Sequence, residues 1–463
     1  MVSGLAQPGR LASSLCDVDD QISARLADYA SKDDDYWTFR GRTLRVEEAR
    51  TLFQYPAMMV GAMQRELMAS IVDLQPGVRR IADPFAGGGT VQSEAMFLGL
   101  DVVSQDINPM AILLCRVKGE CVDATSASAA GQRVTNAAQS DTSGTLDIAF
   151  PGLTKWFRPA AADDLARLRR AIKGETTPAI RRFLWATLAE TVRLTSNSRT
   201  STFKLHIRPA EKIEALPEVI PTFSKLLDRN VASQRAFLET LRLHNHLLQG
   251  AYTGSVRVVH GDTTKGLDGE FDLLVTSPPY GDNGSTIPYG QASYLALQWM
   301  DLKDISADLG PEWLRTTQEI DRRSLGGKSA GDAEASIVTG LRARSPSLAT
   351  TLDKLSDLPP DRARRVFAFT RDLDATLAPI VRSMRENAYL VWTVGNRRVG
   401  GLEVPLDSIL GELLSYHGVF PVGQAVDRRI TSKRMAHRNT IAATMTHERT
   451  LVFRKQASSG REN

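Results

Sequence analysis

Short apolar runs alternate along the chain with longer segments in which apolar residues recur at helical spacing. The apolar runs end in polar or glycine-rich turns, and we interpret them as buried strands. They lie at residues 79–82, 102–106, 255–259, 271–276 and 388–394. Helical spacing follows each of the first two runs. Strands that alternate with helices in this way predict an α/β fold with a doubly wound sheet.

A long helical region interrupts this alternation after the second predicted strand. Residues 153–249 have largely helical spacing, and residues 124–144, rich in Ala, Ser, Thr and Gly, predict a flexible link or a weak helix. This region is too long for a crossover connection, so we expect a helical insertion between the second and third strands. Residues 324–360 contain many Gly, Ser, Ala and Pro residues without a sustained period, which predicts a mobile loop.

These patterns divide the 463-residue chain into parts. Its length exceeds the size at which one core stops growing, which favours a main domain with a substantial insertion. The expected parts are an N-terminal tail and helix at 1–50, the first part of the main domain at 51–122, the insertion at 123–250, which is a candidate target-recognition region, the rest of the main domain at 251–455 and a disordered tail at 456–463.

A glycine-rich loop follows the first predicted strand. It runs from Asp83 to Thr90 as Asp-Pro-Phe-Ala-Gly-Gly-Gly-Thr, and its glycines let the backbone approach a ligand closely. The loop lacks the Gly-Lys-Ser/Thr ending of a phosphate loop and the full dinucleotide spacing. The acidic Asp83 instead favours a cationic cofactor that carries an amino acid. Asp106 ends the second predicted strand, where a carboxylate is well placed for ribose hydroxyls.

A second motif, Ser277-Pro-Pro-Tyr280, follows the apolar run at 271–276. Neither proline can donate a backbone hydrogen bond, so the strand ends there, and Pro279 also holds Pro278 in an extended conformation. The motif therefore predicts a stiff turn at the carboxyl end of a strand, which is the edge where open α/β sheets bind ligands. A hydroxyl, a fixed carbonyl and an aromatic ring would be held together there.

Together these stretches resemble the S-adenosylmethionine-dependent amino-methyltransferases of DNA. Residues 83–90 match the family's cofactor loop, Asp-Pro-Phe-x-Gly-x-Gly-Thr, and residues 277–280 match its catalytic motif, Asp/Asn/Ser-Pro-Pro-Tyr. Residues 106–109 look like its ribose-binding motif, and residues 260–262 look like the motif whose Asp meets adenine. Tyr55-Pro56 is similar to the upstream motif that closes over the cofactor's methionine. The resemblance spans residues 53 to 454, with a large gap in the middle.

The resemblance implies a Rossmann-like methyltransferase sheet, S-adenosylmethionine as the cofactor and no metal. The cofactor-binding residues it implies are Tyr55, Asp83, Pro84, Phe85, Gly87, Gly89, Thr90, Asp106, Ile107 and Asp262. The catalytic residues it implies are Ser277, Pro278, Pro279 and Tyr280. Enzymes that act on a base inside a duplex flip it into a pocket. We expect Ser277 Oγ and the Pro278 carbonyl to hold the amine of a flipped base, and Tyr280 to stack on its ring.

Ser277 also bears on which base is methylated. Cytosine-N4 enzymes of the family mostly carry Ser at this position, whereas adenine enzymes mostly carry Asp or Asn, so the resemblance favours cytosine N4. Adenine N6 is the alternative. An RNA guanine-N2 methyltransferase is less favoured because of Ser277 and because there is no obvious separate RNA-binding domain. An inactive DNA-binding regulator with the same fold is less favoured because Asp83, Ser277 and Tyr280 are intact.

Composition and charge set the expected surroundings. The apolar content of 42% and charged content of 24% are ordinary for a globular protein, and the net charge of +4 excludes little, because a DNA enzyme needs only one basic face. Three cysteines form no metal or disulfide pattern, and no apolar run is long enough to span a membrane. We expect a cytoplasmic, nucleoid-associated protein of prokaryotic type. Its expected partner is double-stranded DNA. Whether a cognate restriction endonuclease is a second partner is left open by the sequence.

Two groups of basic residues are candidates for contacts with DNA phosphates. The basic residues between Arg167 and Arg208, in the insertion, are equally consistent with DNA contact and with a solvated helix face. The C-terminal candidates are Arg428, Arg429, Lys433, Arg434 and Arg438.

Overall fold

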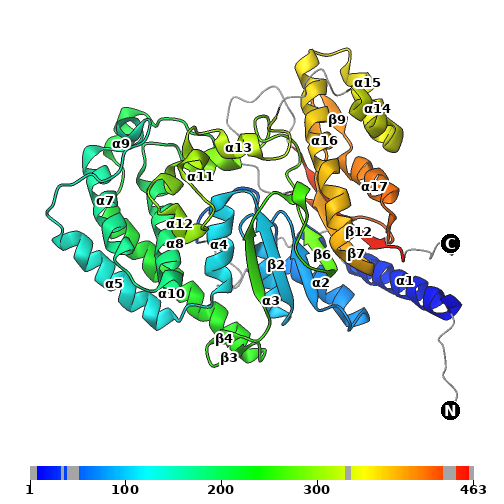
Figure 1. Cartoon of the computed structure of the whole chain (residues 1–463), viewed down its shortest axis with the longest axis horizontal. Coiled ribbons are helices and arrows are strands. Elements are labelled where there is room, and N and C mark those ends of the chain that lie inside the picture. Colours follow the sequence, from blue (N-terminus) through cyan, green and yellow to red (C-terminus); the bar gives the residue numbers. More distant parts are fainter. Residues whose placement is uncertain (1–7, 33–35, 39–51, 329–334, 431–444, 458–463) are drawn as a thin grey trace.

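The computed structural model describes residues 8–32, 36–38, 52–328, 335–430 and 445–457. A sheet with strand order β10-β12-β7-β6-β1-β2-β5 forms the centre of the molecule, and β11 pairs with β12 beside this path (Figure 1). Its strands are β1 (Arg80–Asp83), β2 (Asp101–Asp106), β5 (Val256–His260), β6 (Phe271–Thr276), β7 (Met384–Val394), β10 (Val419–Pro421), β11 (Val426–Arg429) and β12 (His447–Lys455).

The strand order confirms the predicted doubly wound, Rossmann-like α/β sheet. Strands β5, β2, β1, β6 and β7 are parallel, and β12 is antiparallel to β7, β10 and β11. The chain order runs outward from β1 through β2 to β5, and then restarts on the other side of β1 with β6 and β7. The topological switch point therefore lies between β1 and β6, and their carboxyl ends border the crevice where such sheets bind ligands.

Side chains that alternate along the parallel strands supply two separate cores. Ile81, Leu273 and Val391 pack in a cluster with helices on one face. Their chain neighbours Ala82 and Leu274 pack on the opposite face, as the period of two in a strand requires. The first face is covered by α1 (Pro8–Lys32), α2 (Gly61–Leu74) and α3 (Thr90–Phe97), and the second by α16 (Pro360–Ser383) and α17 (Leu406–Tyr416).

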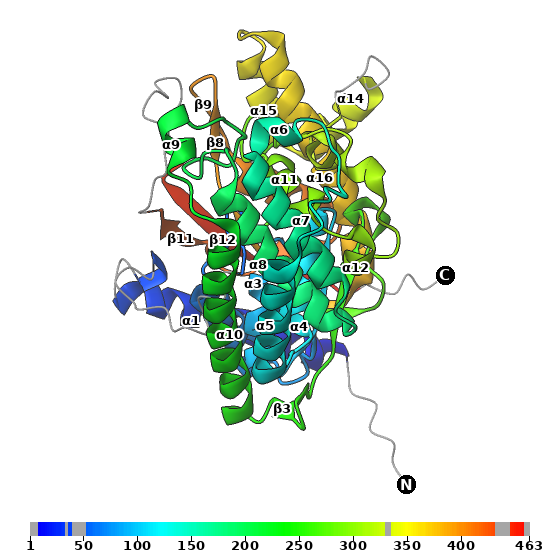
Figure 2. The ribbon, with the colours of Figure 1, turned by 90° about the vertical axis from the view of Figure 1, so that its left-hand side faces the viewer.

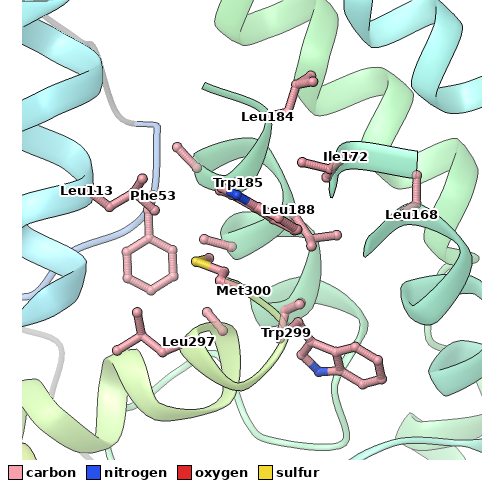
Figure 3. Packing of buried hydrophobic residues seen from close by; sticks show 14 of the residues in the cluster. Phe53, Leu113, Leu168, Ile172, Leu184, Trp185, Leu188, Leu297, Trp299 and Met300 are labelled. Carbon is pink, nitrogen blue, oxygen red and sulfur yellow. The ribbon is translucent and has the colours of Figure 1, made fainter. Parts of the chain in front are cut away.

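The expected helical insertion lies between β2 and β5 and stands to one side of the sheet, as Figures 1 and 2 show. It follows α4 (Pro109–Gly119). Its elements are α5 (Ala124–Ser140), α6 (Leu153–Trp156), α7 (Pro159–Lys173), α8 (Pro178–Thr195), α9 (Ala210–Glu214), α10 (Val219–Leu243) and the small hairpin β3 (Leu247–Leu248) and β4 (Ala251–Tyr252). One hydrophobic cluster joins the insertion to α4 and to α11 (Tyr289–Gln298), and Figure 3 shows Phe53, Trp185 and Trp299 in it.

Two segments with loop-like composition contain regular helices. Residues 124–140 form α5, so of the two predictions, a flexible link or a weak helix, the helix is confirmed, and Ala127, Ala130 and Ala138 are buried on one of its faces. Residues 335–344 and 346–355, inside the predicted mobile loop, form α14 (Ala335–Arg344) and α15 (Pro346–Leu355). Leu348 and Leu355 are fully buried, and Ser345 Oγ caps α15 by accepting from the Leu348 N–H at 3.1 Å. Residues 329–334 of that predicted loop lie outside the described residues.

The remaining elements are short and connect the larger ones. They are η1 (Tyr36–Thr38), η2 (Thr263–Lys265), α12 (Leu302–Ile305), η3 (Pro311–Leu314), α13 (Glu319–Arg323), β8 (Arg397–Val399) and β9 (Leu402–Val404). None of the helices in the described ranges combines the length and apolar character needed to cross a membrane.

Candidate functional site

A pocket lies at the carboxyl edge of the parallel strands, beside the switch point. It holds about 850 Å³ of space when its open mouth is included. The segments that follow β1, β2, β5 and β6 all line it, so residues far apart in the sequence meet there. Its lining includes Pro84, Phe85, Gly87, Thr90, Asp106, Ile107, Asp262, Ser277 and Pro279, with Tyr55 from the upstream segment. Four other expected site residues, Asp83, Gly89, Pro278 and Tyr280, do not line it.

The glycine loop comes close to the upstream segment. Gly87 has φ of 49°, in the left-handed region that favours glycine, and a Cβ built there would lie 3.3 Å from Tyr55 Cε1. A Cβ at Gly88 would lie 3.0 Å from the sulfur of Met58. Lys118 Nζ, on α4, donates to the Gly88 carbonyl at 2.5 Å. The glycine loop therefore exposes its backbone to the pocket. The buried Lys118 side chain holds the loop in place through the Gly88 carbonyl.

The carboxylate of Asp106 fixes the end of β2 against this loop. Its Oδ2 accepts from the Gly87 N–H and its Oδ1 accepts from the Asn108 N–H, each at 2.8 Å. Burial raises the pKa of Asp106, and these two hydrogen bonds oppose the rise. A carboxylate oxygen has more than one acceptor direction, so both oxygens can still accept from a ligand hydroxyl in the pocket.

Asp83 lies beneath the glycine loop with no exposed surface. Its Oδ1 accepts from Thr276 Oγ1 at 2.7 Å and from the Phe85 N–H at 3.2 Å. Its Oδ2 is buried and has no hydrogen-bond partner among the described residues. Burial raises the pKa of Asp83 to about 7. An ionised carboxylate with one oxygen unpaired is uncompensated there, and a nearby positive charge would stabilise it.

Asn108 lies within the motif at residues 106–109 but was not among the expected cofactor-binding residues, and the structure places it in the pocket lining. Its Oδ1 caps α4 by accepting from the Met110 N–H at 3.0 Å, while its Nδ2 donates to Tyr55 and to Ser293 Oγ, both at 3.1 Å. The Tyr55 ring also lies 5.8 Å from the Tyr289 ring. Asn108 thereby joins the β2 end, the upstream segment and α11. The sequence could have indicated Asn108 as a helix cap, because an Asn directly before a proline favours the start of a helix.

The turn after β5 forms the next part of the pocket wall and is bonded to the glycine loop. Thr263 Oγ1 donates to the Pro84 carbonyl at 2.8 Å, which links this turn to the glycine loop. Asp262 Oδ1 accepts from the N–H and the hydroxyl of Thr264, at 3.0 and 2.8 Å. Asp262 therefore lines the pocket, and its Oδ1 is occupied by hydrogen bonds within its own turn.

The motif after β6 extends from the pocket into a polar chain. Ser277 lines the pocket, and its Oγ lies 3.2 Å from the hydroxyl of Tyr280, which donates to Glu448 Oε1 at 3.0 Å. Glu448 in turn pairs with Arg428. Burial and the charge of Glu448 raise the pKa of the Tyr280 hydroxyl well above its usual value. Glu448 lies outside all the sequence motifs, and only its contact with Tyr280 places it beside the site.

Asn283 forms part of the pocket wall next to this motif and is held by Asp321. Asn283 Nδ2 donates to Asp321 Oδ1 at 3.0 Å, and that carboxylate also accepts from the Gly290 N–H at 2.8 Å. Asn283 lines the pocket, and its Oδ1 is buried without a hydrogen-bond partner in the described parts of the chain.

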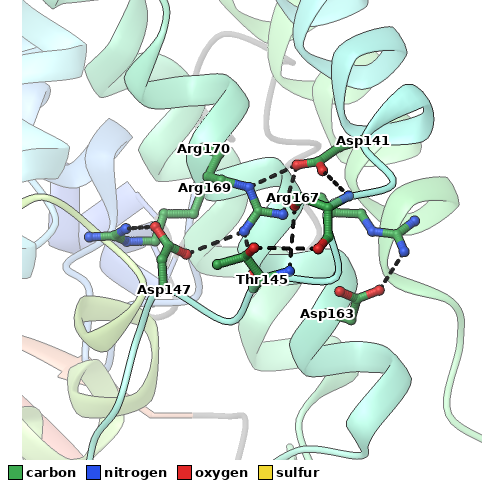
Figure 4. A network of polar contacts seen from close by, with 8 residues as sticks. Asp141, Thr145, Asp147, Asp163, Arg167, Arg169 and Arg170 are labelled. Carbon is green, nitrogen blue, oxygen red and sulfur yellow. Dashed lines mark hydrogen bonds and ion pairs between the residues drawn. The ribbon is translucent and has the colours of Figure 1, made fainter.

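Six arginines of the insertion, expected either to contact DNA or to form a solvated helix face, are paired with carboxylates of the protein. Arg167 pairs with Asp163, Arg169 with Asp147 and Arg170 with Asp141 (Figure 4). Farther along the chain, the partners are Asp304 for Arg181, Glu120 for Arg182 and Glu190 for Arg193. These guanidinium groups are engaged within the protein, so they hold the insertion together.

The C-terminal basic residues have different environments. Arg428 is 19% exposed and pairs with Glu448, so it faces the motif at 277–280 instead of presenting a free charge to a phosphate. Its neighbour Arg429 is exposed. Lys433, Arg434 and Arg438 lie outside the described residues.

Within the described ranges, no three His, Cys, Asp or Glu side chains form a group able to hold a metal ion.

Comparisons with known proteins extend over most of the chain. The Type II methyltransferase M.MvaI of Kocuria varians is 29% identical over 397 residues, which cover 83% of this chain and 85% of that protein. The solved rRNA methyltransferase aviRa from Streptomyces viridochromogenes covers 89% of this chain and 94% of its own, with 10% identity and a TM-score of 0.30, a likeness too weak to carry an argument. No family model matches the chain. The similarity to M.MvaI supports a methyltransferase.

Proposed function

We propose that this protein is a site-specific DNA methyltransferase that transfers a methyl group from S-adenosylmethionine to the exocyclic amine of a flipped base, with cytosine N4 as the target. One observation carries the proposal. The glycine loop with Asp106 and the Ser277 motif, which lie far apart in the sequence, line one pocket at the switch point of the sheet. The similarity to a Type II methyltransferase over most of both chains supports the same function.

The residues present fit this cofactor. The glycine loop lines the pocket and has no Cβ at Gly87 or Gly88, so a ligand can approach its backbone closely. Asp106 would accept from ribose hydroxyls, Asp262 would lie near the adenine, and Tyr55 would close over the methionine portion. The ionised carboxylate of Asp83, buried beneath the loop, would favour a cationic ligand through its charge. The bound cofactor supplies an activated methyl group on a sulfonium, so a poor nucleophile can be methylated without a covalent enzyme intermediate.

The chain's own residues would hold the amine. Ser277 Oγ and the Pro278 carbonyl accept its two hydrogens, which favours a tetrahedral nitrogen whose lone pair points towards the methyl group. Most of the acceleration is then orientation and electrostatics. The Tyr280 ring would stack on the flipped base, an interaction worth about 1–3 kcal/mol. Ser277 favours cytosine over adenine by its match to the cytosine-N4 pattern.

The test is methyl transfer to unmethylated duplex DNA, with nucleosides of the product identified by mass spectrometry and RNA treated in parallel. We expect 4-methylcytosine in DNA and no methylated RNA. The Ser277→Ala variant should lose most turnover and keep its cofactor affinity, whereas Ser415→Ala, on α17 away from the pocket, should keep both. 6-Methyladenine as the sole product would support the adenine alternative, and methylation of RNA alone would contradict DNA as the substrate.

Two wider proposals accompany this function. The protein would act in the cytoplasm in association with the nucleoid, and it would act either with a cognate restriction endonuclease for the same DNA site or without one. A host genome sequenced at single-base resolution for methylation would identify that site.

A further inference from the structure

Four polar side chains form a continuous chain behind the catalytic motif. Ser277 Oγ and the Tyr280 hydroxyl lie 3.2 Å apart, Tyr280 donates to Glu448 Oε1 at 3.0 Å, and Glu448 Oε2 pairs with Arg428. Ser277 lies at the pocket, and Arg428 and Glu448 are each 19% exposed. The chain therefore leads from the pocket wall towards the surface.

Glu448 determines the direction of these hydrogen bonds. An ionised carboxylate can only accept, and each hydroxyl carries a single proton. The Tyr280 proton points to Glu448, so the Tyr280 oxygen can only accept from Ser277. The Ser277 proton then points to Tyr280, away from the pocket. The oxygen of Ser277 is left to face the pocket as an acceptor, which is the role that the proposed function requires of it.

The surrounding structure holds this arrangement in place. Arg428 on β11 and Glu448 on β12 are direct cross-strand partners, so their side chains lie on one face of the β11–β12 strand pair. The Tyr280 ring packs against Gly395, where an added Cβ would lie 2.8 Å from Tyr280 Cδ2. Tyr280 stays a neutral phenol because burial and Glu448 raise its pKa well above the usual value. A neutral phenol can both donate and accept, as a relay requires.

We propose that Glu448 is a positioning residue that makes Ser277 an acceptor for the base amine and receives, through Tyr280, the proton that the amine releases. This inference rests on the proposed function. As the nitrogen–methyl bond forms, the sulfur–methyl bond breaks and its electron pair remains on sulfur. The amine proton passes to Ser277 Oγ, the Ser277 proton to the Tyr280 oxygen, and the Tyr280 proton to Glu448. The partly exposed carboxyl group of Glu448 then releases the proton to water.

The test compares Glu448→Gln and Tyr280→Phe with the unaltered enzyme. Phe keeps the aromatic ring and removes only the hydroxyl. We expect each variant to lower kcat by about 100-fold or more, the usual contribution of general acid–base catalysis, with unchanged cofactor affinity by calorimetry. The double variant should be no slower than either single variant, because both interrupt one relay. Asp427→Asn is the matched control, since it removes the Asp427–Arg449 ion pair on the same β11–β12 strand pair.

A comparison of kcat with KM separates a relay from a packing effect. The charged and titratable groups facing Glu448 are Arg428, Tyr280 and Tyr289. Glu448→Gln should lower kcat and leave the KM for DNA unchanged, because the relay acts only as the proton leaves the amine.

Each outcome decides one of the two proposals. No methyl transfer by the unaltered protein, to DNA or RNA, would contradict the proposed function itself. If the unaltered enzyme is active and Glu448→Gln stays within twofold of Asp427→Asn, the relay is wrong. A loss in Glu448→Gln that is accompanied by lower cofactor affinity or a lower melting temperature would assign Glu448 a structural role and overturn the inference.

Discussion

The backbone N–H of Gly87 donates to Asp106 Oδ2 at 2.8 Å, so the loop after β1 is anchored on the carboxylate that ends β2. This one contact joins the two stretches that the resemblance assigns to the same cofactor. It also makes the loop conformation depend on a residue expected to contact ribose.

Replacing Asp106 should weaken cofactor binding more than a comparable change elsewhere on the same strand. In Asp106→Asn, one of two backbone donors, Gly87 N–H or Asn108 N–H, faces an amide nitrogen. A buried donor without its acceptor costs about 1–3 kcal/mol. We expect about a tenfold or greater loss of S-adenosylmethionine affinity by calorimetry. Asp101→Asn, at the opposite end of β2, where Asp101 Oδ1 accepts from the Ser255 N–H at 2.7 Å, is the control. Equal losses in both variants would contradict a local role for Asp106.

Adding a methyl group at Gly87 should harm binding without unfolding the protein. Gly87 has φ of 49° and a Cβ there would crowd Tyr55, so Gly87→Ala must shift either the loop or the aromatic wall. Gly77→Ala is the matched control, because its Cβ would meet nothing within 4 Å. We expect a loss of cofactor affinity in the first variant alone, with helical circular dichroism preserved in both. Normal affinity in Gly87→Ala would show that the loop does not form the cofactor surface.

The stability of the ligand-free protein should depend on pH through Asp83. Burial raises its pKa from 3.8 to about 7, so the folded protein retains a proton that the unfolded chain has already released. The stabilisation from this proton is complete below about pH 4 and is lost as pH rises through 7, a change of up to about 4 kcal/mol. Asp83→Asn removes the titration.

Calorimetric melting at pH 5 and pH 8 tests this dependence. The melting temperature of Asp83→Asn should be close to that of the unaltered protein at pH 5 and higher at pH 8. An equal difference at the two pH values would mean that Asp83 does not titrate as described.

The basic residues should separate into structural and DNA-contacting sets. Arg429 is exposed, so Arg429→Ala should lower DNA affinity and flatten its salt dependence by about one unit of slope if it contacts a phosphate. Arg170 pairs with Asp141 at 2.7 Å, so Arg170→Ala should leave that slope unchanged and cost at most about 1 kcal/mol of stability. Filter binding over a salt series measures both slopes. A flattened slope in Arg170→Ala alone would reverse the assignment.

Features with a local signal could be predicted from the order of residues alone. Apolar runs that end in Gly or Pro predicted the five parallel strands, and the spacing after the second of them predicted the insertion. The lining of one pocket by residues such as Pro84, Asp106 and Ser277 was predictable for the same reason, since the carboxyl ends of parallel strands share one edge.

Local signals were insufficient where burial had to select a conformation. Residues 124–140 and 335–355 have compositions typical of loops, but their small or apolar faces are covered by other helices. The structure of α5 and α15 therefore depends on partners supplied by distant parts of the chain.

The partners of the charged groups are set by how the folded chain brings distant segments together. Arg428 was expected to contact DNA because it lies in a basic run, but strand pairing places it against Glu448, whose other oxygen binds Tyr280, 168 residues earlier in the chain. Arg169 and Arg181 of the insertion similarly pair with carboxylates outside their own helices, Asp147 and Asp304. Electrostatic contacts form between side chains that meet in space, and the order of residues in the sequence carries no record of those distances.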